Sequence, residues 1–171
     1  ARETVIRIET RIERWELNEP FVTARDSSTY IPVLVAILTD SNGVRGWGEA
    51  AGVDYAGESP ESMAAEIAGV AAQLHDGLDG PELLRLLPAG GARNALDCAL
   101  WDLRAKQSGV RVWQTARLPA PQPIATAYTL GLCDEVSTRR KARAAVRYPL
   151  LKLKVDAERH LDIVRIVREE H

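Results

Sequence analysis

Alternating hydrophobic and polar positions open the chain and predict a β-strand over residues 4–15. Isoleucines recur on one face of this strand, while arginine and glutamate alternate on the other face. Such a period of two is typical of a strand with one buried face. The β-branched run 30–39 predicts a second strand, and Asn42-Gly43 predicts a tight turn into a third strand over 44–50. Together these segments predict a three-stranded antiparallel meander.

Two polar segments interrupt this pattern and are expected to be loops. Residues 18–29 are irregular and hold Phe21 and Arg25, and residues 51–58 contain Tyr55.

Helical periodicity follows the meander. Ser59 before Pro60 is a typical helix start, and the helix is expected to run to about residue 74. A short helix is expected near 81–87. The most regular helix is expected over 92–107, where apolar residues recur at the i, i+3, i+4, i+7 spacing of a buried stripe. Strands followed by helices predict an α+β domain.

A proline-rich connection over 118–123 cannot continue a helix. We therefore predict a domain boundary there, with an α+β capping domain in residues 1–120 and a second domain in residues 121–171.

The second domain is expected to contain strands over 124–130 and 150–155 and helices over 134–147 and 156–171. This βαβα order is typical of a parallel sheet or barrel. A closed (β/α)₈ barrel takes eight such units, so two units predict the truncated start of a TIM barrel.

The strand 150–155 carries Lys152 and Lys154 on one face and apolar residues on the other. Spacing alone also fits an edge strand with solvated lysines. However, the chain has four lysines against eighteen arginines, and half of the lysines lie here. Lysine can lose its proton when desolvated or crowded by another cation, whereas arginine cannot. The pair therefore indicates a role in proton transfer.

The composition limits the kinds of partner and the cellular location that we expect for the chain. The net charge is −2 and the chain has no basic block, so nucleic acid is not favoured. No apolar run approaches the roughly 20 residues of a membrane span. Two cysteines without metal-like spacing fit a reducing cytoplasm, which is the expected location.

Several blocks of sequence resemble the enolase superfamily, and within it the N-terminal part of the muconate-lactonizing subgroup and its dipeptide epimerases of the L-Ala-D/L-Glu type. The blocks are Gly46-Trp47-Gly48-Glu49-Ala50, Tyr55-Ala56-Gly57-Glu58-Ser59, Ala92-Arg93-Asn94-Ala95-Leu96-Asp97-Cys98-Ala99-Leu100-Trp101-Asp102-Leu103, Thr126-Ala127-Tyr128-Thr129-Leu130 and Leu151-Lys152-Leu153-Lys154. Residues 110–118 depart from the family's usual pattern.

The resemblance implies an isomerase that abstracts and returns the proton next to a carboxylate, with Lys154 as the acid/base on one face of the substrate. A base must be unprotonated near pH 7, and the neighbouring charge of Lys152 favours that form. Lys152 is also expected to contact the substrate carboxylate. The family uses Mg²⁺, but its metal ligands and second catalytic lysine lie on later strands. We therefore expect no metal and no activity in the 171-residue chain itself.

The resemblance also implies substrate contacts. Arg25 matches a position that contacts an acidic side chain, Thr129 matches a substrate-contacting threonine, and Tyr55 is a candidate to line the pocket. A solvated loop arginine, a buried strand threonine and a packed loop tyrosine are the alternatives. Asp97 and Asp102 lie on a helix of the capping domain and are expected to be structural.

Other functions stay open at this point. N-succinylamino acid racemase, o-succinylbenzoate synthase and muconate cycloisomerase would share both lysines, and a non-catalytic binding module would carry them as surface charges. The expected partners are a dipeptide substrate and further copies of the chain, because an incomplete barrel exposes strand edges.

Overall fold

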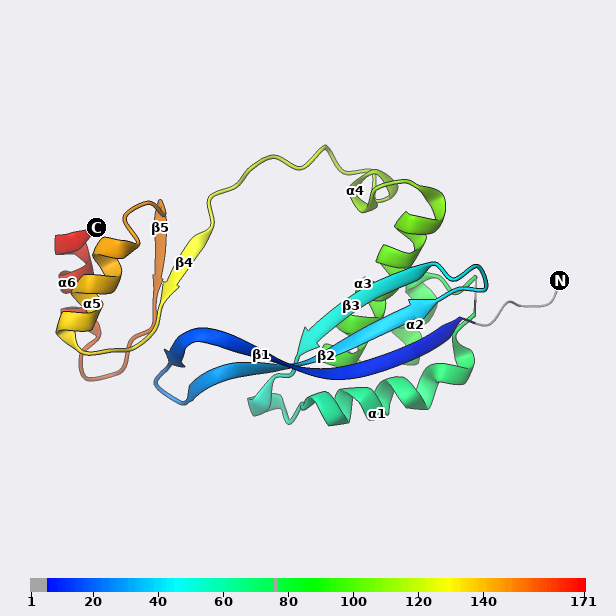
Figure 1. The fold of residues 1–171 in the computed structure, drawn as a ribbon, viewed down its shortest axis with the longest axis horizontal. Coiled ribbons are helices and arrows are strands. Elements are labelled where there is room, and N and C mark those ends of the chain that lie inside the picture. The colour runs from blue at the N-terminus through cyan, green and yellow to red at the C-terminus, as the bar shows by residue number, and fades with distance from the viewer. Residues whose placement is uncertain (1–5, 76) are drawn as a thin grey trace. The chain divides into compact units, whose positions relative to one another are not determined.

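The computed structural model describes residues 6–75 and 77–171 (Figure 1). The chain forms two compact units. The first consists of Ala1–Trp15 and Ile31–Pro121, and the second consists of Glu16–Tyr30 and Gln122–His171.

Three strands form an antiparallel sheet in the order β1-β2-β3, as predicted: β1 Arg7–Val22, β2 Ser27–Thr39 and β3 Arg45–Ala51. The predicted loop over 18–29 is wrong for most of its length, because β1 and β2 continue as a two-stranded ribbon and leave a turn at 23–26. Pairing with the partner strand satisfies the backbone polar groups of this polar segment, so no hydrophobic alternation is needed.

The β2–β3 turn is held by Asp40, which is buried. Its carboxylate accepts hydrogen bonds from the backbone N–H groups of Asn42 (2.8 Å) and Val44 (2.9 Å) and from Nε2 of Gln107 (2.9 Å). The hydrogen bond from Gln107 is the main cause of the lowered pKa of Asp40. Gly43 supplies the positive φ of 82° that the turn requires.

Helices follow the sheet in the predicted order. They are the single turn η1 Asp54–Ala56, α1 Pro60–Val70 with the 3₁₀ turn η2 Ala71–Gln73, α2 Gly80–Leu86, α3 Gly91–Ser108 and α4 Val112–Thr115. Ser59 caps α1, since its hydroxyl accepts the Ser62 N–H at 3.1 Å. The turn η1, which lies inside the predicted loop 51–58, and the short helix α4 were not predicted.

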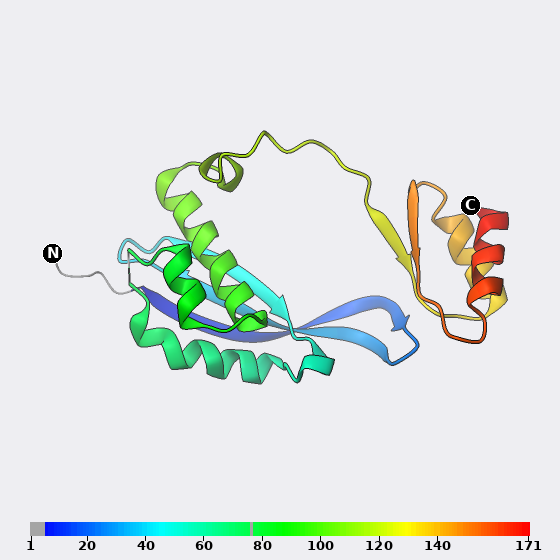
Figure 2. The same cartoon turned by 180° about the vertical axis from the view of Figure 1, so that it is seen from behind.

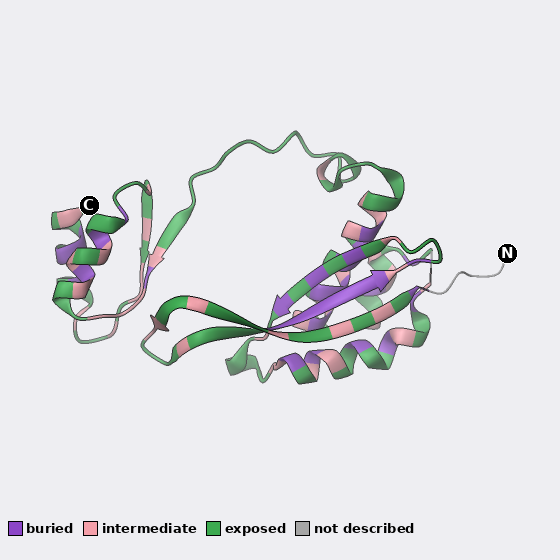
Figure 3. Ribbon diagram, viewed as in Figure 1, coloured by how far each residue is buried: buried purple, intermediate pink, exposed green. Residues whose placement is uncertain are grey.

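The core of the first unit lies between the sheet and its helices (Figures 2 and 3). Leu34, Ala36 and Leu38 of β2 pack with apolar residues of α1, α2 and α3. Residues on the other face of β2 are also buried, so this central strand is apolar on both faces.

Gly46 and Gly48 let β3 approach α3 closely. A Cβ atom at either glycine would overlap the helix backbone, at Ala99 for Gly46 and at Ala95 for Gly48. The Gly-Trp-Gly block is therefore a packing requirement of the strand–helix contact.

The second unit contains two βα repeats: β4 Ala127–Leu130, α5 Glu135–Ala144, β5 Leu150–Leu153 and α6 His160–Glu170. The two strands pair in parallel, as predicted. Each element is shorter than expected. The helix predicted from residue 156 begins at His160, because Asp156 accepts the N–H groups of Glu158 (3.1 Å) and Arg159 (2.6 Å) and closes a turn instead.

Candidate functional site

The two faces of the parallel strands β4 and β5 differ in their chemistry. Leu130, Leu151 and Leu153 pack in the apolar cluster formed with α5 and α6. Thr129 and Lys152 are register partners and alternate with these leucines. They therefore lie on the face turned away from the helices.

Lys154 lies one residue beyond the end of β5, although the strand was predicted to reach residue 155. Its backbone N–H donates to the carbonyl of Leu130 at 2.9 Å, which continues the ladder by one bond. The alternation places Lys154 on the same face as Lys152. Lys152 is exposed and Lys154 is half-buried. The structure thus places Lys152 away from the apolar cluster, while the shared role of the two lysines stays a prediction.

Phe21 is a residue of this region to which the sequence assigned no role. The Lys154 Nζ atom lies 6.0 Å from the centroid of the Phe21 ring, within the range of a cation–π contact. Phe21 is far from Lys154 along the chain, and its place in the same polar segment as Arg25 was the one signal available.

Arg25 lies in the turn between β1 and β2 and is exposed. Thr23 shapes this turn: its hydroxyl accepts the N–H groups of Arg25 (3.2 Å) and Asp26 (3.1 Å), and its own N–H donates to the Asp26 carbonyl at 2.8 Å. Arg25 belongs to the second unit, together with Thr129 and both lysines.

Tyr55 belongs to the first unit and is 86% exposed on the single turn Asp54–Ala56. Glu58 closes this loop, because its carboxylate accepts the N–H groups of Val53 (3.0 Å) and of Gly91 at the start of α3 (2.7 Å). The structure thus brings Thr129, Lys152 and Lys154 to one face and presents Tyr55 on the other unit.

Asp102 has a structural role, as expected. It accepts the backbone N–H of Trp47 on the edge strand β3 (2.8 Å) and pairs with Lys106 (2.6 Å). Asn94 donates to the carbonyl of Glu49 on the same edge at 3.2 Å. Side chains of α3 thereby occupy backbone groups that an edge strand would leave open.

Across residues 6–75 and 77–171, no three His, Cys, Asp or Glu side chains lie close enough together to hold a metal ion. In the same part of the chain, no helix has the length and apolar character that crossing a bilayer demands.

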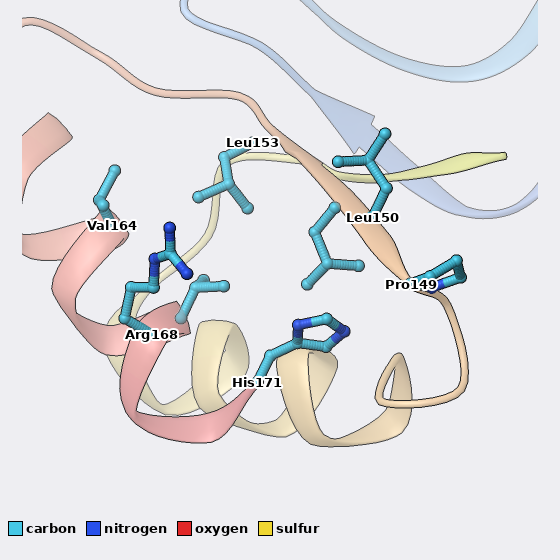
Figure 4. A pocket seen from close by; sticks show the side chains of 8 residues that line it. Pro149, Leu150, Leu153, Val164, Arg168 and His171 are labelled. Carbon is cyan, nitrogen blue, oxygen red and sulfur yellow. The ribbon is translucent and has the colours of Figure 1, made fainter. Parts of the chain in front are cut away.

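A pocket of about 280 Å³ opens between β5 and α6 (Figure 4). Leu150, Leu153 and Val164 give it apolar walls, and Arg168 and His171 add polar groups. Neither Lys152 nor Lys154 lines it, so this pocket is separate from the lysine face.

Comparison with known proteins identifies relatives of the chain. The N-terminal domain of the mandelate racemase / muconate lactonizing enzyme family matches residues 5–115. The L-Ala-D/L-Glu epimerase of Escherichia coli (strain K12) is 39% identical over 157 residues, which cover 91% of this chain and 48% of that protein.

Solved structures give the same fold. An enolase family member from Agrobacterium tumefaciens with homology to dipeptide epimerases, with bound sodium and L-Ala-L-Glu, has a TM-score of 0.86 and 36% identity over 96% of this chain and 51% of its own. The dipeptide epimerase from Methylococcus capsulatus, complexed with Mg and the dipeptide L-Arg-D-Lys, has a TM-score of 0.84 and 27% identity over 98% and 51%. The chain spans about half the length of these relatives.

Proposed function

Because the chain belongs to the mandelate racemase / muconate lactonizing enzyme family, we propose that it supplies the N-terminal half of a dipeptide epimerase of the L-Ala-D/L-Glu type. The observation that carries the proposal is the face of β5. Lys152 alternates with the leucines of the apolar cluster, Thr129 is its register partner, and Lys154, two residues further on, continues the ladder through its N–H to Leu130. The 39% identity to the Escherichia coli epimerase supports the substrate class.

In this proposal Lys154 exchanges a proton at Nζ with the carbon next to the substrate carboxylate. Lys152, two residues away on the same face, holds that carboxylate by its charge. A second base, supplied by the half of the protein that this chain does not span, faces the opposite side of the carbon. Removal of the proton on one side and its return on the other invert the stereocentre.

The remaining predicted residues concern substrate recognition. Arg25 has the charge to pair with an acidic side chain of the dipeptide, and the Thr23 turn holds its backbone in place. Thr129 adds a hydroxyl beside Lys152, and Tyr55 offers an exposed aromatic ring.

The described residues do not form a magnesium site. The Methylococcus capsulatus relative is complexed with Mg, and we propose that the whole protein takes its carboxylate metal ligands from strands outside this chain.

The test is a chimera in which this chain replaces the matching half of the Escherichia coli epimerase. We expect it to epimerise L-Ala-D-Glu, followed by NMR in D₂O, and we expect the 171-residue chain alone to show no turnover. Lys154→Arg should reduce epimerisation by about 10²–10⁴-fold, because general acid/base catalysis at one face is lost. Exchange of the α-proton should persist for one epimer, since the opposite base is intact.

Lys106→Arg is the matched control, because Lys106 pairs with Asp102 on α3, in the first unit. Full epimerase turnover by the Lys154→Arg chimera, or by the 171-residue chain alone, would contradict the proposal.

A further inference from the structure

The turn end of the β1–β2 ribbon, residues 16–30, is fastened to the loop that follows β4. The backbone N–H of Leu132 donates to the carbonyl of Val22 at 2.9 Å. Gly131 allows this approach, since a Cβ there would lie 3.2 Å from the Val22 carbonyl oxygen and 3.6 Å from Cδ2 of Phe21. The backbone of the ribbon end is thus in close contact with the backbone of the loop that follows β4.

An ion pair adds a second attachment. Lys141 of α5 lies 2.8 Å from Glu19 of β1, and the Lys141 side chain is 16% exposed. Two attachments of different kinds therefore fix the ribbon end against the βα repeats, and Phe21 lies between them in sequence.

The fixed ribbon end presents Phe21, the chain's single phenylalanine, to the Lys154 ammonium group at 6.0 Å from the ring centroid. A lysine at the end of a strand has four rotatable bonds and many rotamers in water. A ring face that attracts the ammonium group reduces the positions its nitrogen adopts.

We propose that Phe21 is a positioning residue for Lys154. The two attachments hold the ribbon end in place, and the Phe21 ring then restricts the positions that the Lys154 nitrogen adopts next to β5. The catalytic consequence rests on the proposed function, in which this nitrogen exchanges the substrate proton. Proton transfer requires a close and aligned approach, so positioning should act on the chemical step more than on substrate binding.

The contact is tested on the 171-residue chain by NMR with lysine labelled at the ε-carbon. The chain has four lysines, so four labelled signals have to be assigned. We expect an NOE between the Phe21 ring protons and the Lys154 ε-methylene group, and a ring-current shift of that methylene. Phe21→Leu should abolish the shift, Phe21→Tyr should keep it, and the signals of Lys106 should not change. A Lys154 signal that is identical in the wild type and Phe21→Leu would overturn the proposal.

The consequence for catalysis is tested in the active chimera. Phe21→Leu should lower kcat by about tenfold or more while KM changes by less than about twofold, and Phe21→Tyr should restore kcat. A rise in KM with kcat unchanged would overturn the positioning role and indicate a substrate contact instead. An inactive wild-type chimera would contradict the proposed function, while the NMR result would still decide whether Phe21 holds Lys154.

Discussion

Gly48 is a residue whose missing side chain matters for stability. A Cβ at this position would overlap the carbonyl of Ala95, which is backbone and has no rotamer to change. Relief would require α3 to move away from β3, although Ala95, Leu96 and Ala99 are fully buried in the core.

We therefore expect Gly48→Ala to lower the free energy of unfolding by about 1–3 kcal/mol or more, as measured by urea unfolding with tryptophan fluorescence. Gly69→Ala on α1 is the matched control, because no atom lies within 4 Å of a Cβ there. Alanine in an open helical position should raise stability by roughly 0.5–1 kcal/mol. Equal stability of Gly48→Ala and the wild type would show that the strand–helix contact tolerates a methyl group.

At the scale of elements, α5 and α6 are joined by a group of ion pairs. Arg139 contacts Glu135, Glu169 and Glu170, and Arg143 also contacts Glu170. Hydrogen bonds from Arg143 and then Arg139 lower the pKa of Glu170 from 4.5 to about 2. The Glu170 side chain is 10% exposed, so this pairing is more protected from solvent than an ordinary surface ion pair.

The lowered pKa of Glu170 determines the direction in which stability changes with pH. Glu170 contributes stability that is fully present above its unfolded value of 4.5 and is lost as the pH falls through about 2. Glu170→Gln should therefore flatten the decline in the stability of α6 between these pH values, measured by urea unfolding followed through amide NMR signals of α6. Asp162→Asn, in an exposed pair with Arg165 on the same helix, should leave the decline unchanged. Identical profiles for both variants would contradict this reading of the ion pairs.

Elements with clear periodicity were predictable from the sequence. The apolar stripe of α3 and the alternation of leucines around Lys152 each reflect burial directly, so the sequence predicted both the helix and the strand β5. The ribbon over 16–30 was not predictable from the sequence, because strand pairing and attachments to residues such as Leu132 hold it in place. The contact between Phe21 and Lys154 was missed for the same reason, since it depends on tertiary structure.

At the scale of the whole molecule, the two units have separate cores of different size. Eighteen buried apolar side chains form the described cluster of the first unit. The cluster between β4, β5, α5 and α6 contains four. Because stability grows with the apolar surface removed from water, the second unit should open more readily than the first.

Amide hydrogen exchange measures this difference. We expect the amides of α3 to exchange slowest and those of α5 and α6 to exchange faster, with local opening at lower free energy. In the chimera, strands and helices from the other half should cover more of the second unit, so exchange in α5 and α6 should slow while α3 changes little. Equal protection of α5, α6 and α3 in the 171-residue chain would contradict this prediction. The small cluster around Leu130 and Val167 would then be as stable as the large core, although it buries fewer apolar side chains.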